Sequence, residues 1–342
     1  ENFELIKKDL IKNNFIFKGT TDTEVIPHLL NHFLNMGKSF FEASKNLLKS
    51  IEGAYAFSII NSEKNEIFVS RKTSPLALGI GENFNLVCSD AQSISTLVNK
   101  VIYLEDGDYA FISANKFEIY NQDDKKVFRQ MINIKSNFNL INKDGYRHFM
   151  EKEIFEQPNV LKNTIGSLIE NNSELNISPE KMGFKEGSGI IICAAGTSHY
   201  AAMIGKYWIE RFASIPVSIE LSSEFRYRKP VTSNFSTMIA ISQSGESIDT
   251  LMAMREAKKL NLATMAVVNV ENSTIDREAD YSLYTNVGTE IGVASTKSFT
   301  SQLIVLLMIA FRLALYNKKI DRKYLSEFIS NIKIIPLFLS KI

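Results

Sequence analysis

The sequence contains very little cysteine: two residues in 342, Cys88 and Cys193. They lie far apart in the chain, and each sits in an apolar run. This scarcity excludes a disulfide framework and a cysteine-based metal site. We therefore expect two buried, unreactive thiols in a reducing compartment, and we predict a cytoplasmic protein.

The sequence also has no excess of charge of either sign. Lys and Arg number 39 and Asp and Glu number 38, so the formal net charge is +1. A protein that binds nucleic acid by neutralising phosphates, or a membrane through a polybasic segment, needs more positive charge. The most apolar stretch, residues 303–315, is interrupted by Arg312 and is too short to span a bilayer. We expect neither a nucleic-acid nor a membrane partner, and a buried helix at 303–315.

Common nucleotide and metal motifs are missing as well. The sequence contains neither G-x-x-x-x-G-K-[ST] nor G-x-G-x-x-G, which disfavours an ATPase or a dinucleotide enzyme. Of the four histidines, His28 and His32 are four residues apart, but no glutamate follows His28 to make H-E-x-x-H. We interpret both as helix-surface or packing residues. The sequence predicts no metal site and no cofactor.

The composition is that of a globular protein, with 45% hydrophobic and 23% charged residues, and the length suggests two domains. Residues 1–125 show helical spacing followed by short strand-like runs separated by Asn, Gly, Ser and Pro, which predicts an α+β domain. Residues 126–145 are polar and rich in Asn, which is typical of a linker.

The pattern changes from residue 146 onward. Residues 190–195 form a fully apolar run, as expected for the central strand of a parallel sheet. Similar runs at 217–221, 237–242 and 263–270 alternate with helical segments. Residues 146–320 are therefore predicted to form a doubly wound parallel-sheet α/β domain, followed by a helix over 321–342.

Hydroxyl side chains gather where these predicted strands end. The segments in question are 196–198, 242–247 and 295–298. Ligands of open parallel sheets bind beyond the carboxyl ends of the strands, where a helix N-terminus with Ser or Thr donors suits a phosphate. Ser and Thr at one helix start are more often simple N-caps. Three such loops at successive strand ends favour a phosphorylated small molecule.

These motifs resemble a known family. The segment Ser242-Gln243-Ser244-Gly245-Glu246, with 196–198 before it and 288–297 after it, is similar to the first sugar-isomerase (SIS) domain of the glucosamine-6-phosphate synthases. Residues 146–158 match the family's linker pattern. The segments 21–25, 53–55 and 74–76 resemble the later part of its glutaminase domain. The resemblance covers essentially the whole chain.

The resemblance implies a reaction and its sites. The family uses glutamine to aminate and isomerise fructose 6-phosphate to glucosamine 6-phosphate, the first step of hexosamine and UDP-N-acetylglucosamine synthesis, and its SIS domains commonly pair, which implies a homodimer. Its glutaminase is an N-terminal-nucleophile hydrolase. By resemblance Asp22 would hold the α-amino group of glutamine, although it could equally be an N-cap for a helix starting at Thr23. The positions that match the family's phosphosugar-binding residues are Thr197, Ser198, Ser242, Gln243, Ser244, Ser247, Val293 and Ser295.

The sequence also departs from the family pattern. The Cys-Gly-Ile start with its nucleophile, the oxyanion segment and the second SIS domain with the isomerisation residues have no counterpart in it. We therefore expect a piece of a longer protein that has no catalytic residue of its own and is inactive alone. Smaller differences are Ala195 where the family often has Cys and Ser247 where it often has Thr. A fructosamine-type deglycase and a sugar-phosphate-binding regulatory SIS module remain the alternatives.

Overall fold

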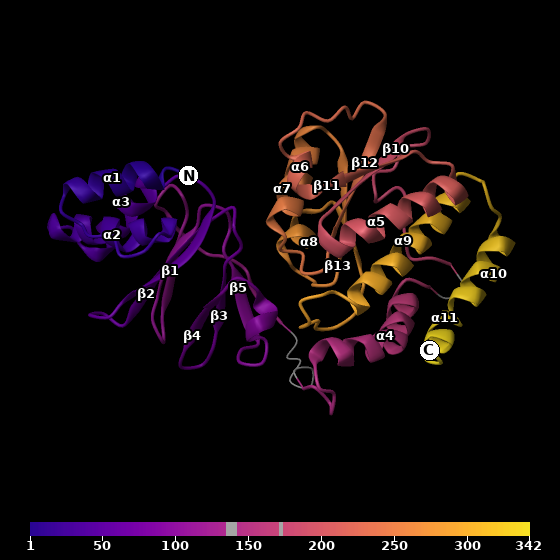
Figure 1. Ribbon diagram of the computed structural model, residues 1–342, viewed down its shortest axis with the longest axis horizontal. Helices are drawn as coiled ribbons and strands as arrows, with labels where there is room; N and C mark the ends of the chain where they lie inside the picture. Colours follow the sequence, from indigo (N-terminus) through magenta and orange to yellow (C-terminus); the bar gives the residue numbers. More distant parts are fainter. Residues whose placement is uncertain (135–141, 171–173) are drawn as a thin grey trace. The chain divides into compact units, whose positions relative to one another are not determined.

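The computed structural model describes residues 1–134, 142–170 and 174–342. The chain divides into two compact units, Glu1–Phe138 and Asn139–Ile342, which are coloured from indigo to magenta and from magenta to yellow in Figure 1. Each unit has its own hydrophobic core and is described separately.

The first unit opens with amphipathic helices. They are α1 (Phe3–Lys12), the short 3₁₀ turn η1 (Asp22–Glu24), α2 (Val25–Asn35) and α3 (Phe40–Ser50). Helix α3 begins with a capping box, in which Ser39 Oγ accepts a hydrogen bond from the Glu42 N–H and the Glu42 carboxylate accepts one from the Ser39 N–H. The buried faces of the helices, with Leu47 at their centre, pack on Phe68 and Phe111 of the neighbouring sheet.

Two antiparallel sheets follow the helices. Their strands are β1 (Tyr55–Asn61), β2 (Glu66–Lys72), β3 (Ala77–Ile80), β4 (Asn85–Cys88), β5 (Lys100–Tyr103), β6 (Tyr109–Ile112), β7 (Phe117–Tyr120), β8 (Lys126–Val127) and β9 (Met131–Asn133). The sheet orders are β1-β2-β6-β7-β8 and β4-β3-β5-β9. Alternate residues point to opposite faces, so Phe68 contacts the helices while Val69 faces Leu78 of the second sheet. The layers are helices, sheet and sheet, an α+β arrangement.

The segment predicted as a linker contains two of these strands. Strand β8 pairs with β7, and β9 pairs with β5. Between them, Arg129 donates from Nε and Nη2 to the two carboxylate oxygens of the buried Asp108, at 2.8 and 2.9 Å. The prediction of a linker was therefore wrong over residues 126–133, because strands of two or three residues are too short to show a period. Residues 135–141 of the predicted linker lie outside the described part of the chain.

The second unit is built on a parallel sheet with helices on both faces. Its strands are β10 (Gly189–Ala194), β11 (Val217–Leu221), β12 (Phe235–Ser242), β13 (Ala263–Val268) and β14 (Tyr281–Tyr284). The sheet order is β11-β10-β12-β13-β14, and every neighbouring pair is parallel. The chain thus turns to opposite sides of β10 for β11 and β12, which confirms the predicted doubly wound α/β fold and creates a topological switch point between β10 and β12.

The helices of this unit form two layers. They are α4 (Phe149–Ser167), α5 (Gly196–Trp208) with its π-helical extension η4 (Ile209–Ala213), α6 (Ser222–Phe225), α7 (Ile248–Lys259), α8 (Thr274–Glu278), α9 (Lys297–Tyr316), α10 (Arg322–Ile332) and α11 (Ile335–Leu339). Ile190 and Ile192 of β10 face the layer that contains α4, α5 and α9, whereas Ile191 and Cys193 face the layer of α6 and α7. Figure 1 shows α5 and α9 side by side.

Helix α9 is the core helix of this unit. Its 20 residues include an 18-residue window apolar enough to cross a membrane, and 67% of that window is buried inside the unit. The prediction of a buried helix is confirmed. The prediction that this segment is too short to span a bilayer was wrong, because the helix has 20 residues and extends beyond the apolar run at 303–315. Burial between neighbouring helices is what identifies α9 as a core element.

The final helical segment is broken in two. Helix α10 starts after Asp321, whose carboxylate accepts a hydrogen bond from the Tyr324 N–H, and Pro336 lies at the start of α11. Ile332 is buried, whereas Leu337 and Phe338 are each 58% exposed. The single helix predicted over 321–342 is therefore corrected, since proline has no N–H with which to continue α10.

Candidate functional site

A hollow of about 350 Å³ lies at the switch point between β10 and β12. Its walls come from the loop after β10, the loop after β12 and the segment before α9. The lining residues are Ala195, Gly196, Thr197, Ser198, Ile241, Ser242, Gln243, Ser244, Ser247, Thr250, Val293, Ala294 and Ser295. The structure therefore brings together all eight residues that the sequence predicts for a phosphosugar.

Two helix N-termini open onto this hollow. Helix α5 begins at Gly196 and α7 begins after Ser247, and within the described residues neither helix has a side-chain cap. Simple N-capping therefore does not explain the hydroxyls of Thr197 and Ser247. No capping side chain accepts a hydrogen bond from the first-turn N–H groups of α5 or α7 in the described residues. The positive ends of both helix dipoles lie at the hollow.

The loop after β12 is tightly organised by its own serines. Ser242 Oγ lies 3.0 Å from Ser247 Oγ and accepts a hydrogen bond from the Gly245 N–H at 3.1 Å. Ser244 Oγ accepts a hydrogen bond from the Glu246 N–H at 3.1 Å. Gly245 has φ +67°, and a Cβ there would lie 1.9 Å from Ser273 Oγ. Only glycine fits this position, so the loop holds its hydroxyls in one arrangement.

The third hydroxyl-rich segment is different. Glu290 accepts hydrogen bonds from Ser295 Oγ at 3.1 Å, from the Thr296 N–H at 3.0 Å and from the Ser298 N–H at 3.2 Å. The N-terminus of α9 is thus already occupied by a carboxylate. Of the three predicted loops, two offer an open helix N-terminus, and the third supplies a wall through Val293, Ala294 and Ser295.

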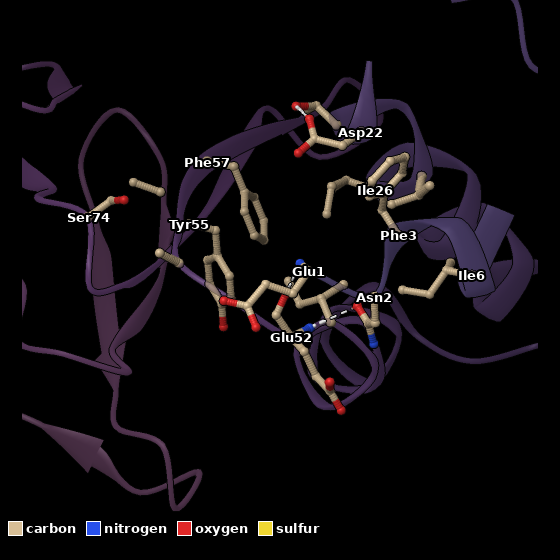
Figure 2. Close-up of a pocket in the computed structure, with 15 residues that line it drawn as sticks. Glu1, Asn2, Phe3, Ile6, Asp22, Ile26, Glu52, Tyr55, Phe57 and Ser74 are labelled. Atoms are coloured by element: carbon tan, nitrogen blue, oxygen red, sulfur yellow. Dashed lines mark hydrogen bonds between the residues drawn. The ribbon is translucent and has the colours of Figure 1, made fainter. Parts of the chain in front are cut away.

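Asp22 lines a separate hollow of about 300 Å³ in the first unit. Figure 2 shows Asp22, Ile26, Tyr55 and Phe57 around it. Asp22 is exposed, and its Oδ1 accepts a hydrogen bond from Thr23 Oγ1 at 3.2 Å. It lies in the first turn of η1, and the N-caps of η1 and α2 are Thr21 and Glu24. Asp22 is therefore not an N-cap, and its glutamine-binding role stays a prediction.

Neither thiol is among the residues that line the two hollows. Burial raises the pKa of Cys88 to about 11 and that of Cys193 to about 12. Cys193 is fully buried, as predicted, but Cys88 is only partly buried. Both thiols are protonated at neutral pH. Within the described residues no group of three or more His, Cys, Asp or Glu side chains could hold a metal ion.

Histidine packing agrees with the sequence interpretation. His28 lies edge-on to Phe15 and Phe17, and its Nε2 is 3.6 Å from Glu24 Oε1. His32 also contacts Phe15. Both rings belong to the packing of α2.

The sequence prediction misses one buried hydroxyl among the residues that line this hollow. Thr250 is 1% exposed and its hydroxyl lies 3.0 Å from Ser222 Oγ. It follows Ser247 by three residues, so the two share a face of the first turn of α7. That helical spacing is the signal that could have identified it.

Comparisons with known proteins match both units. Residues 184–312 match the SIS domain, and residues 1–96 match a glutamine amidotransferase domain. The chain is 38% identical over 98% of its length to the glutamine–fructose-6-phosphate aminotransferase [isomerizing] of Fusobacterium nucleatum, and covers 55% of that protein. For the same enzyme of Bradyrhizobium diazoefficiens the identity is 42%, over 91% of this chain and 52% of the relative.

A solved structure supports the same relationship. The C-terminal domain of glucosamine-fructose-6-phosphate aminotransferase from Francisella tularensis is 41% identical with a TM-score of 0.55, covering 57% of this chain and 56% of that one. The chain spans about half the length of the curated relatives it matches. The chain is similar over nearly its whole length to the isomerizing glutamine–fructose-6-phosphate aminotransferases, and it matches a glutamine amidotransferase domain followed by an SIS domain.

Proposed function

We propose that the protein takes part in the glutamine-dependent amination and isomerisation of fructose 6-phosphate to glucosamine 6-phosphate, and that the hollow of the second unit binds the phosphosugar. The observation that carries this proposal is the meeting of eight predicted residues with two uncapped helix N-termini at the switch point of a parallel sheet. The names of the relatives supply the reaction.

The chemistry of the hollow suits a phosphate dianion. Hydroxyls of Ser242, Ser244 and Ser247 can donate hydrogen bonds to phosphate oxygens, and the first-turn N–H groups of α5 and α7 can do the same. No Lys, Arg or His is among the described residues that line the hollow. Binding therefore depends on neutral donors and helix dipoles, which confer geometric selectivity for the phosphate oxygens.

The first unit would supply the glutamine site. Asp22 carries a carboxylate at a hollow whose other walls include Ile26, Tyr55 and Phe57. This carboxylate can pair with an ammonium group, and a ligand that fills the hollow would reduce the screening of the pair by water. We assign Asp22 to the α-amino group of glutamine, and the helix–sheet–sheet layers to a glutaminase of the N-terminal-nucleophile type.

We also propose a cytoplasmic homodimer that pairs through the second unit. Tyr200, Met203 and Tyr207 on α5 are 61%, 43% and 65% exposed. Their spacing of three and four residues places them on one helix face, where a partner surface would cover them. Sedimentation velocity of the wild type and of Tyr200→Ser tests this. A monomeric wild type would contradict it.

Titration calorimetry tests the phosphosugar site directly. Fructose 6-phosphate and glucosamine 6-phosphate are expected to bind, whereas unphosphorylated fructose is not. Failure of both phosphosugars to bind would refute the proposal. Binding without any aminotransferase activity in the longest available form of the protein would favour a regulatory SIS module. A deglycase is disfavoured because residues 1–96 match a glutamine amidotransferase domain.

A glutaminase assay tests whether this chain alone hydrolyses glutamine. Cys88 and Cys193 are the chain's two cysteines, and both have raised pKa values. The thiolate is the nucleophilic form, so we expect the 342-residue chain alone to release no glutamate from glutamine. Robust turnover that is lost in Cys88→Ala would instead make Cys88 a nucleophile.

A further inference from the structure

We propose that Glu153 is a positioning residue for the phosphosugar hollow. From helix α4 it binds the backbone of Ile291 and Gly292, and it thereby sets the position of the wall formed by residues 293–295. The inference rests on the proposed function, since it concerns how that same hollow recognises its ligand.

The contact is a buried carboxylate satisfied by backbone N–H groups. Glu153 is 2% exposed. Its Oε1 accepts hydrogen bonds from the Ile291 N–H at 2.6 Å and from the Gly292 N–H at 3.1 Å, and its Oε2 lies 3.2 Å from the Gly292 nitrogen. No cation of the described residues forms a recorded ion pair with this carboxylate. Charge-assisted hydrogen bonds of this kind are stronger than neutral ones, and the buried charge depends on them.

The close approach explains a glycine in the same segment. A Cβ at residue 292 would lie 2.5 Å from Glu153 Oε2 and 3.4 Å from the Cα of Met150. A side chain at this position would displace the Glu153 carboxylate from the two N–H groups. Gly292 is therefore the residue that allows the carboxylate to reach both N–H groups.

Hydrogen bonds also hold the C-terminal end of this wall, at Ser295. Glu290 binds Ser295 Oγ and the first N–H groups of α9. The Nζ of the buried Lys297 lies 2.7 Å from Glu156 Oε2, one turn along α4 from Glu153. Both flanks of residues 293–295 are thus bonded, while the Val293 side chain between them is fully exposed. The position of this wall depends on α4.

The charges indicate which part of the ligand this wall meets. The N-terminus of α9 already holds the Glu290 carboxylate, which would repel a phosphate. The starts of α5 and α7 have no such carboxylate cap in the described residues, and Asp249 in the first turn of α7 has its Oδ1 3.7 Å from Arg226 Nη1. The phosphate therefore belongs to the serine loops, and residues 293–295 face the uncharged part of the sugar. Loss of the Glu153 contact would weaken sugar recognition and leave phosphate binding intact.

The test compares Glu153→Gln with Glu186→Gln, an exposed glutamate in a turn of the same unit. Fructose 6-phosphate binding is measured by calorimetry and inorganic phosphate binding by ³¹P NMR, well below each variant's unfolding temperature. For Glu153→Gln we expect the dissociation constant for fructose 6-phosphate to rise about tenfold or more, because charge-assisted bonds are lost. Phosphate affinity should not change, and the peptide containing residues 291–292 should exchange its amide hydrogens faster. Glu186→Gln should match the wild type.

A second variant changes the residue that Glu153 contacts, Gly292. Gly292→Ala should reproduce the loss of fructose 6-phosphate affinity, and the double variant should lose little more, because both changes break one contact. Unchanged sugar affinity in Glu153→Gln would overturn the inference, and so would an equal loss for sugar phosphate and phosphate. A wild type that binds no phosphosugar would refute the proposed function itself, an outcome distinguishable from either of these.

Discussion

Replacement of Ser247 by Ala is expected to change ligand binding with little effect on folding. Ser247 lies directly before α7, its side chain is exposed, and it makes no capping hydrogen bond in the described structure. Its Oγ lies 3.0 Å from Ser242 Oγ and forms no other hydrogen bond with the described residues. We therefore expect the free energy of unfolding to fall by at most about 0.5 kcal/mol, as for ordinary surface substitutions.

The effect on binding should be much larger. A hydrogen bond from Ser247 to a phosphate oxygen is worth about 1.5–3 kcal/mol, the range for bonds to charged groups. Each 1.4 kcal/mol is a factor of about ten in affinity, so the dissociation constant should rise roughly 10- to 150-fold. The serine hydroxyl that remains at position 242 stays bonded to the Gly245 N–H, which preserves the loop.

Calorimetry with fructose 6-phosphate and glucosamine 6-phosphate measures this change. Ser247→Thr is the matched control, because threonine keeps the hydroxyl and should retain most of the affinity. Thermal unfolding of both variants should resemble that of the wild type. Equal affinity of the Ala and Thr variants would refute the assignment of this hydroxyl to the phosphate, and a large loss of stability in the Ala variant would refute the reasoning about its local role.

Three further predictions concern the folding of the loop, the first unit and the thiols. Gly245→Ala should destabilise the second unit by more than about 2 kcal/mol in denaturant titrations, because a Cβ would lie 1.9 Å from Ser273 Oγ at a residue with φ +67°; near-normal stability would contradict the close contact. In a form of the protein with glutaminase activity, Asp22→Asn should raise the glutamine requirement and leave the use of free ammonia intact; equal loss of both would contradict the assignment. Cys88 and Cys193, with pKa values raised to about 11 and about 12, should react slowly with maleimide at pH 7 until the protein is unfolded; rapid labelling of the folded protein would contradict this.

Local patterns predicted most of what positions the phosphosugar hollow. An apolar run such as residues 190–194 is long enough, and rich enough in β-branched residues, to indicate a buried parallel strand. Parallel strands send their carboxyl ends to one edge of the sheet, so loops far apart in sequence meet there. Both properties are local or topological, and they predicted the three hydroxyl-rich loops; the eight residues themselves were named from the family resemblance.

Short elements escaped the same reasoning. Strands β8 and β9 have two and three residues, too few to show alternation. Their place is decided by pairing with β7 and β5 and by the bond of Arg129 to the buried Asp108. The contacts of β9 with β5 and of Arg129 with Asp108 join residues more than 20 positions apart, and no periodicity in the sequence reveals them. The break between α10 and α11 is different, because Pro336 is a local signal that the prediction of one helix over 321–342 overlooked.

The sequence by itself determined the α/β alternation, the hydroxyl-rich loops and the family resemblance. Only the tertiary structure decided which helix N-termini are open. It shows that Glu290 fills the start of α9, and that Glu153, 138 positions before Ile291 in the chain, binds the wall of the hollow. The physical reason is that a carboxylate's role depends on the N–H groups it meets after folding. Glu290 meets N–H groups six and eight positions further along the chain, whereas the partners of Glu153 are set by the packing of α4 against the segment before α9.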